Sequence, residues 1–377
     1  MKYLLTFMFL LLMNSYLYAV EIVSKIDKPI ATISIVDVGQ GDGILIQDFE
    51  NNKTVLIDAG KPSGEIITFL KEQKINSINL FILTHPHADH IGSAKKVLQT
   101  FDIKKVLDSG YPHSSKMYKD VLEVIKEKNI AYSLGKSGQN IKIGENKKIK
   151  VLAPGESYFS GTRSDANSNS VVFQLIIGDV KFFFSADSEA ETENFVLENH
   201  EDIKSDVLKI AHHGGRHSTT DSFLEKVDPK VAVISVATEN SYGHPSKEVL
   251  EKLKDKNIET HLTMNEGTIQ IDTDGKNIAI RKSGFRSEEK EDDREEIEVI
   301  EKNDPDNFKD IKMTPVKLDK DGNPVFNKDY FYSSKKSKIY YTYNCSGLSK
   351  IKAKNLIEFK TIEDAEKTGR TLAKNCG

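Results

Sequence analysis

Three of the chain's ten histidines and one aspartate fall within six residues of the segment T-H-P-H-A-D-H. This segment directly follows the apolar run NLFIL, a pattern typical of a buried β-strand. His85 and His87 can direct their imidazoles at one cation, while Asp89 and His90 can supply oxygen and nitrogen to a second. Such ligands suit zinc or manganese, and a site that keeps an open coordination position is catalytic. The alternative is a solvated loop that is merely rich in histidine.

Two later segments also place ligand-type side chains at the ends of predicted strands. The run FFFSAD ends in Asp187, a carboxylate that could bridge two cations or could cap the helix that follows. An unpaired aspartate at this point would be costly to bury. The predicted strand 206–211 ends in His212 and His213. We assign metal binding to His212 and proton transfer or substrate contact to His213, although the spacing also allows the reverse.

The order of these motifs resembles that of the metallo-β-lactamase fold. Four further segments resemble the hydrolase domain of ComEC-type competence proteins, in which that domain is fused to a DNA-uptake channel. They are DVGQGD at 37–42, NSVVF at 169–173, KIAHHG at 209–214 and YGHPS at 242–246. The resemblance covers residues 28–285. It implies an α/β fold, an αββα sandwich with a dinuclear metal cleft at one edge.

The resemblance also implies a role for each ligand. His85 and His87 would bind the first ion, and Asp187 would bridge both ions. Asp89, His90 and one of the paired histidines would bind the second ion. The two divalent ions, zinc or manganese, would activate water for in-line attack and stabilise the developing charge. Asp89 is therefore counted among the catalytic residues as well as among the ligands.

Other residues are expected around this cleft. His244, in the loop YGHP, is placed to contact a phosphate oxygen or to protonate the leaving group, unless it is only a turn residue. Asp58, in LIDAG, is expected to orient a ligand loop rather than to bind metal. The expected rim residues are Asp37, Gln40 and Asp42.

The chain departs from the family pattern at three points. Gly43 replaces the usual serine after GQGD, and Arg216 follows Gly-Gly where a serine is usual. The superfamily's further histidine before the bridging aspartate has no counterpart, since the only histidine there is His113, in a Tyr-Pro loop. One ion is therefore expected to be held less tightly, or to be completed by Asp165, Asn169 or water.

The chain begins with one basic residue, an apolar core and a small residue, in the stretch MKYLLTFMFLLLMNSYLYAV. This layout predicts a secretory signal peptide over residues 1–19, and hence an exported protein. Leu17 at the −3 position is a poor cleavage signal, so an uncleaved N-terminal anchor stays open. No later apolar run approaches the roughly 20 residues of a membrane span, so we expect no integral channel. The formal net charge of −4 provides no overall basic field for nucleic acid.

Beyond the expected hydrolase domain the composition changes. Residues 286–301 carry nine acidic and three basic side chains, which predicts a hydrated linker over residues 286–310. Within the tail 311–377, the segment Ile339–Cys376 resembles the small zinc-binding domain of the Ada DNA-repair protein, which implies that the tail is a small α+β module. The matching residues are Tyr340, Cys345, Asn355, Phe359, Glu363, Ala365, Gly369 and Cys376.

Two cysteines cannot fill the four positions of a tetrahedral zinc site. A Cys345–Cys376 disulfide is the expected replacement in an exported chain, and two separate thiols are the alternative. Tyr340, Tyr341 and Tyr343 stand near three lysines. They could stack on a nucleic-acid strand, or they could form a small packed core.

Taken together, these features favour a metal-dependent phosphodiesterase or nuclease, with DNA as the expected substrate and partner. A phosphocholine-type esterase of the cell wall, or a lactamase, would use the same site. A third class is a non-catalytic DNA- or wall-binding protein with a relict site. The complete H-x-H-x-D-H set argues against this third class, because a relict site would be free to lose ligands.

Processing of the chain gives the first testable prediction. We expect the mature protein to begin near Val20 or Glu21 and to carry a Cys345–Cys376 bond, because export exposes the thiols to an oxidising compartment. Intact mass of protein from the exported fraction, with and without reductant, measures both. Free thiols in that fraction would contradict the disulfide, and a mass that includes residues 1–19 would indicate an uncleaved anchor.

Overall fold

The computed structural model describes the chain as two compact units, Met1–Glu289 and Lys290–Gly377. The described residues are 20–283 and, in the tail, 314–315, 331–334, 339–342, 356–359 and 371–372. The predicted signal peptide, the acidic linker and both cysteines lie outside these residues, so the domain boundaries drawn from the sequence stay predictions. Within the described residues no helix combines the length and apolarity needed to cross a membrane.

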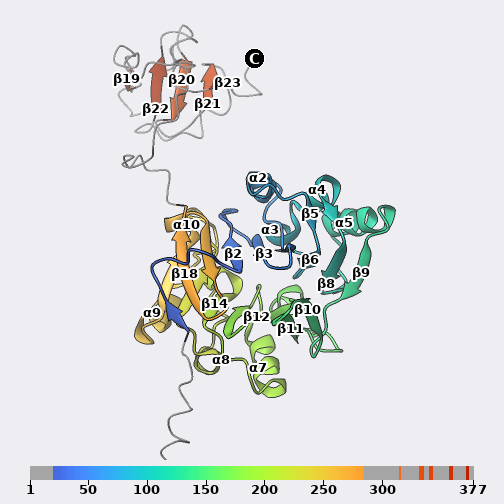
Figure 1. The fold of residues 1–377 in the computed structure, drawn as a ribbon. Coiled ribbons are helices and arrows are strands. Elements are labelled where there is room, and N and C mark those ends of the chain that lie inside the picture. The colour runs from blue at the N-terminus through green and yellow to red at the C-terminus, as the bar shows by residue number, and fades with distance from the viewer. Residues whose placement is uncertain are drawn as a thin grey trace, which may run out of the picture. The chain divides into compact units, whose positions relative to one another are not determined.

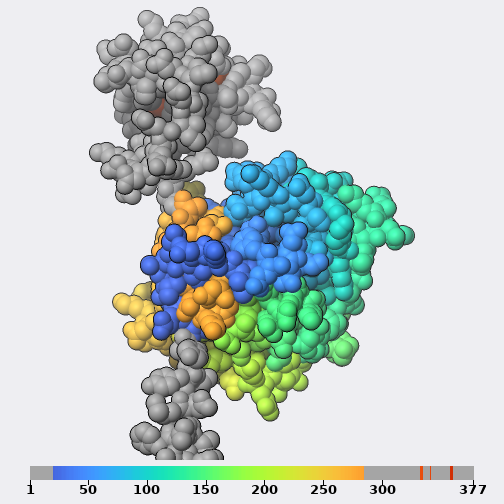
Figure 2. Space-filling model, in the orientation of Figure 1, coloured from blue at the N-terminus to red at the C-terminus, as the bar shows by residue number. Residues whose placement is uncertain are grey.

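The first unit contains a large mixed sheet, in which strands from both ends of the unit pair (Figure 1). Figure 2 shows these early and late segments, in blue and orange, side by side on the surface. In the part of the chain that the structure describes, the strands run in the order β1 (Glu21–Ile22), β18 (Asn277–Lys282), β17 (Ile269–Thr273), β2 (Ala31–Ile35), β3 (Ile44–Asp48), β4 (Lys53–Ile57), β6 (Leu80–Leu83), β8 (Lys105–Asp108) and β9 (Ala131–Leu134).

A second sheet packs against the first. Over the described residues its order is β10 (Asn140–Gly144), β11 (Lys147–Ala153), β12 (Val172–Ile177), β13 (Val180–Phe184), β14 (Val207–Lys209), β15 (Val231–Ile234) and β16 (Glu259–Leu262). The short strands β5 (Ser77–Ile78) and β7 (Asp102–Ile103) form a separate parallel pair.

Helices cover the outer faces of the two sheets (Figure 1). The first sheet is covered by α2 (Glu65–Glu72), α4 (Ala94–Thr100) and α5 (Lys116–Glu127), and the second by α7 (Ala190–Asn199), α8 (Asp221–Val227) and α9 (Lys247–Asp255). The shorter helical segments are α3 (Ala88–Ile91), α6 (Asp165–Ser168), the 3-10 turn η1 (Ala211–Gly214) and α10 (Thr263–Glu266).

Among the described residues of the first unit, three buried apolar clusters correspond to the three contacts between four layers. One cluster joins the two sheets, one joins the first sheet to its helices, and one joins the second sheet to its helices. Strand β6 shows the cause, because its successive side chains point to opposite faces: Leu80 and Ile82 enter the inter-sheet cluster, whereas Phe81 and Leu83 pack against the helices. The predicted αββα sandwich is therefore confirmed.

The strand ends that matter for chemistry lie at a common edge of each sheet. Strand β6 runs parallel to its neighbours β4 and β8, and β14 runs parallel to β13 and β15. Because parallel neighbours end at the same edge, the loops that follow them emerge together. The H-x-H-x-D-H segment follows β6, Asp187 follows β13, and the paired histidines follow β14. Each sheet thus contributes loops to one side of the sandwich.

The second unit is described only in part. Its described residues form a sheet in the order β19 (Thr314–Pro315), β22 (Leu356–Phe359), β20 (Phe331–Ser334), β21 (Ile339–Thr342) and β23 (Thr371–Leu372). Tyr340, Ile357 and Phe359 form a small buried cluster. Most of the residues that carry the Ada-like resemblance, including Cys345 and Cys376, lie outside the described residues, so the Ada-like module stays a prediction.

Candidate metal centre

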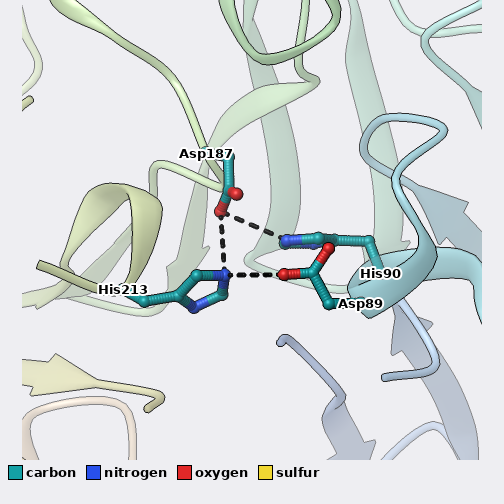
Figure 3. Close-up of side chains that lie close together, drawn as sticks. All are labelled: Asp89, His90, Asp187 and His213. Carbon is teal, nitrogen blue, oxygen red and sulfur yellow. Dashed lines mark ion pairs between the residues drawn. The ribbon is translucent and has the colours of Figure 1, made fainter. Parts of the chain in front are cut away.

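Loops from both sheets bring four ligand-type side chains together. Asp89 and His90 lie in α3, Asp187 follows β13, and His213 lies in η1 (Figure 3). Their ligand atoms all lie within 4.8 Å of one another. Asp187 Oδ1 lies 3.2 Å from His90 Nε2 and 3.4 Å from His213 Nε2. Asp89 Oδ2 lies 3.5 Å from His213 Nε2.

The chemistry of this group fits a divalent cation. His90 Nε2, His213 Nε2 and Asp187 Oδ1 are buried and have no hydrogen-bond partner among the described residues. A buried polar atom left unpaired costs about 1–3 kcal/mol. A cation between the three atoms would satisfy all of them, because imidazole nitrogen and carboxylate oxygen are common ligands of zinc and manganese. The His/Asp cluster can therefore hold a metal ion.

The second oxygen of Asp187 faces a different pair of imidazoles. Asp187 Oδ2 lies 3.8 Å from His85 Nε2 and 3.8 Å from His212 Nε2. His87 Nδ1 lies 3.1 Å from the same nitrogen of His85. Each oxygen of this one carboxylate therefore has its own imidazole neighbours. The adjacent residues His212 and His213 approach different oxygens.

Protonation differs across the cluster of imidazoles. Burial lowers the pKa of His85 well below its usual value, helped by the charge on His90, and burial also lowers the pKa of His87. Burial acts in the same direction on His90, but the carboxylates of Asp187 and Asp58 outweigh it and raise the pKa of His90 well above its usual value. For Asp187, the charges on His213 and His90 outweigh burial and hold its pKa well below the usual range.

Asp58 holds the histidine loop in place. Its Oδ2 accepts hydrogen bonds from His90 Nδ1 at 2.7 Å and from the Thr84 hydroxyl at 2.6 Å, and its Oδ1 accepts one from the Thr84 backbone N–H at 2.8 Å. With Nδ1 of His90 bound to Asp58, Nε2 is left to face the cluster. Asp58 also lies within 4.8 Å of His90 and Asp42. The carboxylates of Asp58 and Asp42 already have protein partners. We therefore assign the group of Asp42, Asp58 and His90 to orienting the ligand loop rather than to binding a metal ion.

His213 is held in a comparable way from the opposite sheet. Its Nδ1 donates to the Ser235 carbonyl at 2.8 Å, which leaves Nε2 free for the cluster. Asp42 Oδ1 lies 3.7 Å from the same Nδ1 and 2.9 Å from Lys209 Nζ, and both partners of this ion pair are buried. The segment DVGQGD is therefore joined to the segment KIAHHG by a buried charge pair.

Gly41 explains why DVGQGD passes so close to the histidine loop. Its φ is +129°, and an added Cβ would lie 2.0 Å from the Asp89 carbonyl oxygen. Next to it, the Asp42 backbone N–H donates to that same carbonyl at 3.2 Å. Only a residue without a side chain allows this approach. The backbone of Asp89 is thus fixed by a strand-end loop from the middle of the first sheet.

Several residues near His212 were not singled out from the sequence. Asn167 Nδ2 lies 3.4 Å from His212 Nε2, and Glu189 Oε1 lies 3.4 Å from His212 Nδ1. Glu189 in turn accepts from Arg163, whose guanidinium is half exposed. Glu189 also occupies the N-cap position of α7, so the interpretation of Asp187 as the cap of that helix is wrong. In the sequence, the feature that could have indicated a role for Glu189 near the site is its position two residues after Asp187.

The predicted rim residues are placed differently from one another. Gln40 is buried and borders the cavity described below, whereas Asp37 is exposed and accepts a hydrogen bond from the backbone of Gly39. Asp165 accepts from Thr162, and Asn169 bonds the backbone of Phe159 and Asp165, so both hold their own loop together. The ring of His113 lies 6.0 Å from that of His87.

His244 lies beside the paired histidines. Its ring centroid is 5.2 Å from that of His212 and 6.5 Å from that of His213. Burial and the neighbouring charges on His212 and His213 lower the pKa of His244 to about 4. The imidazole is therefore neutral near pH 7, which suits a hydrogen-bond donor to a phosphate oxygen better than a stored proton.

A cavity of about 720 Å³ opens over the cluster. Asp89, Asp187, His212 and His213 line it together with His87 and His244. The exposed charged side chains of Arg163, Arg216, Lys247 and Glu248 line it as well. The arrangement is a polar cleft that combines buried metal-ligand side chains with exposed charged ones.

Comparison with known proteins identifies relatives of this region. A family model described as the metallo-beta-lactamase superfamily matches residues 36–238, more than half of the chain. ComE operon protein 3 of Bacillus subtilis (strain 168) is 31% identical over 257 residues, which cover 63% of this chain and 32% of that protein. Recombination protein 2 of Haemophilus influenzae is 26% identical over 243 residues, with coverage of 63% and 28%.

A solved structure of a metallo-beta-lactamase fold protein, YhfI from Bacillus subtilis, covers 67% of this chain and 98% of its own, with a TM-score of 0.41 at 11% identity. The chain spans about a third of the length of the curated relatives it matches.

The pKa shifts predict how metal binding depends on pH. Without a cation, the pKa values of His90 and His213 are raised, so both imidazoles hold protons that a metal ion must displace. Apparent affinity for zinc or manganese should therefore rise with pH until the pH exceeds those raised pKa values. Calorimetric titration at pH 7 in two buffers of different ionisation enthalpy should show at least about one proton released per ion. Binding without proton release would contradict this.

Proposed function

Because the chain belongs to the metallo-beta-lactamase superfamily, we propose that it is an exported metal-dependent hydrolase that cleaves phosphodiester bonds in DNA. The observation that carries this proposal is the placement of Asp187. Its two oxygens face two different sets of imidazoles, which is the arrangement expected of a carboxylate that bridges two cations. A phosphoryl centre has attacking and leaving oxygens that both need charge compensation, and a pair of cations provides it.

The distances favour one division of the ligands. We assign His85, His87, His212 and Asp187 Oδ2 to the first ion, because His85 and His212 face that oxygen and His87 lies beside His85. Asp89, His90, His213 and Asp187 Oδ1 are assigned to the second. In this division both paired histidines are ligands. His212 then fills the position for which the sequence offers no histidine between the first cluster and Asp187.

The chain's own residues would bind and orient the substrate. Divalent ions in such a site supply positive charge to the phosphoryl group and lower the pKa of water. The neutral His244 can donate a hydrogen bond to a non-bridging phosphate oxygen. Asp58 and the Ser235 carbonyl keep the ligand imidazoles of His90 and His213 from rotating.

Exposed cationic side chains in the cavity lining support an anionic substrate. Arg163, Arg216 and Lys247 line the cavity, although the chain as a whole has a net charge of −4. Arg163 and Lys247 also pair with Glu189 and Glu251, which leaves Arg216 as the cation of this lining with no ion pair among the described residues. Positive charge concentrated at a cleft raises the local concentration of an anionic ligand. One relative is named a recombination protein, and recombination is a process that acts on DNA.

An activity panel tests the reaction. We expect the metal-loaded protein to cleave single-stranded DNA and bis-p-nitrophenyl phosphate, and to act at least about a hundredfold more slowly on nitrocefin and p-nitrophenyl phosphorylcholine. His87→Ala and Asp187→Asn should each lower bound metal and activity, because each removes a ligand. Bound metal is measured by elemental analysis of the purified proteins.

His244→Ala is the matched control for this panel, because it should lower turnover while bound metal stays at the wild-type level. Rapid opening of nitrocefin with every DNA substrate intact would show that the phosphodiesterase assignment is wrong. Full metal content in both ligand variants would contradict the assignment of the ligands.

The tail gives a separate prediction. We propose that residues 311–377, rich in lysine and tyrosine, add attraction for DNA that a net-acidic chain otherwise lacks. A chain that ends at residue 310 should bind DNA more weakly, with a smaller dependence of affinity on salt, because fewer phosphates are neutralised. Its hydrolysis of bis-p-nitrophenyl phosphate should match that of the full chain. Equal DNA affinity of the truncated and full-length proteins at several salt concentrations would show that the tail takes no part in DNA binding.

A further inference from the structure

An exposed aromatic ring stands at the mouth of the cavity. Tyr242 is 66% exposed, the largest exposed fraction among the large hydrophobic side chains of the described residues. Its ring is stacked on that of His244, with centroids 5.7 Å apart and an interplanar angle of 29°. One face of the tyrosine ring is thus covered by His244, and the exposure leaves the rest of the ring to solvent. An aromatic ring in this setting can stack on a planar ligand.

The loop that carries Tyr242 is held in one conformation by Asn240. The Asn240 side-chain amide donates to the carbonyls of Ala237 at 3.0 Å and His244 at 2.7 Å. Its Oδ1 accepts from the backbone N–H groups of Tyr242 at 3.2 Å and His244 at 3.0 Å. Four hydrogen bonds from one side chain fix the turn. The ring is therefore pre-organised, which reduces the entropy that a ligand must overcome on binding.

Tyr242 also lines two cavities that share part of their walls. The large cavity and a second cavity of about 400 Å³ share Gln40, Ala88, Asp89 and Tyr242 in their linings. The second cavity adds Lys61, Pro62 and the acidic Glu239 to this shared lining. A chain-like ligand that passes Tyr242 can therefore meet Lys61 in the second cavity and Arg216 in the first.

We propose that Tyr242 is a stacking platform for a nucleobase next to the scissile phosphate, and that the substrate is consequently an unpaired strand. The proposal rests on the function proposed above. Lys61 in the second cavity and Arg216 in the first each offer a cation to a phosphate of a strand that passes Tyr242. Bases in a duplex already stack on their neighbours, so only an unpaired base offers a free face to the ring.

Binding of two oligonucleotides of equal charge tests the proposal. The probes are a thymidine 12-mer and a 12-mer of abasic sites, titrated in EDTA so that no cleavage occurs, with the full mature protein. Wild type should bind the thymidine strand about tenfold more tightly, the effect of one base–aromatic stack. Tyr242→Ala should lose this preference and bind both strands equally. Tyr242→Phe should keep it, because the ring remains.

Two controls separate stacking from general effects. Phe49 is 51% exposed and lines neither cavity, so Phe49→Ala should keep the wild-type preference. The chain contains no tryptophan, so Tyr242→Trp introduces a single tryptophan, which can be excited selectively at wavelengths where tyrosine does not absorb. Its emission should be quenched by the thymidine strand and not by the abasic strand. Equal affinity of the wild-type protein for the two strands would overturn the proposal. So would a Tyr242→Ala variant that still binds the thymidine strand more tightly.

The outcomes also separate this proposal from the proposed function. A base-dependent preference that is lost in Tyr242→Ala supports the stacking platform even if no strand is cleaved when metal is added. Cleavage of both strands at equal affinity and rate would support the phosphodiesterase and overturn the stacking platform. Preference for a duplex over the thymidine strand would likewise overturn it.

Discussion

A single buried carboxylate organises the site. Asp187 is almost inaccessible to solvent, yet imidazoles from both sheets converge on its two oxygens. An isolated carboxylate in such a place would be protonated, because burial disfavours its charge. The surrounding imidazolium charges keep it ionised. The two sheets must therefore pack in a register that brings the ends of β6, β13 and β14 to one point, and the inter-sheet core provides that register.

The ligands are in turn positioned by polar groups below them. The buried pair Asp42–Lys209 links a loop of the first sheet to a strand of the second, and removal of either partner would leave an unpaired buried charge. Breaking such a pair typically costs about 3–5 kcal/mol. Thr84 and Asp58 act similarly beneath His90. The fold and the metal site are thus stabilised by some of the same interactions, so substitutions in these pairs would affect both stability and metal binding.

Much of this arrangement could be predicted because the informative residues follow apolar strands. The alternation of Leu80, Phe81, Ile82 and Leu83 marks a strand buried on both faces, and the histidines come directly after it. The strand Lys147–Ala153 was not predicted, because lysines interrupt its apolar pattern. The roles of Asn167 and Glu189 depend on tertiary packing against His212, which no local pattern encodes. The contacts of His212 and His213 with different oxygens depend on backbone angles that their residue types do not indicate.

Those backbone angles have a consequence for evolution and engineering. His212 and His213 both adopt left-handed conformations, with φ of 50° and 55°. Each such residue costs about 1–2 kcal/mol relative to an ordinary conformation. Two consecutive left-handed residues turn adjacent side chains towards separate oxygens of Asp187, and the rest of the sandwich must supply the compensating stability. Selection for thermal stability alone would favour glycine at either position. Selection for thermostability would favour glycine at these two positions, whereas selection for metal binding would keep histidine.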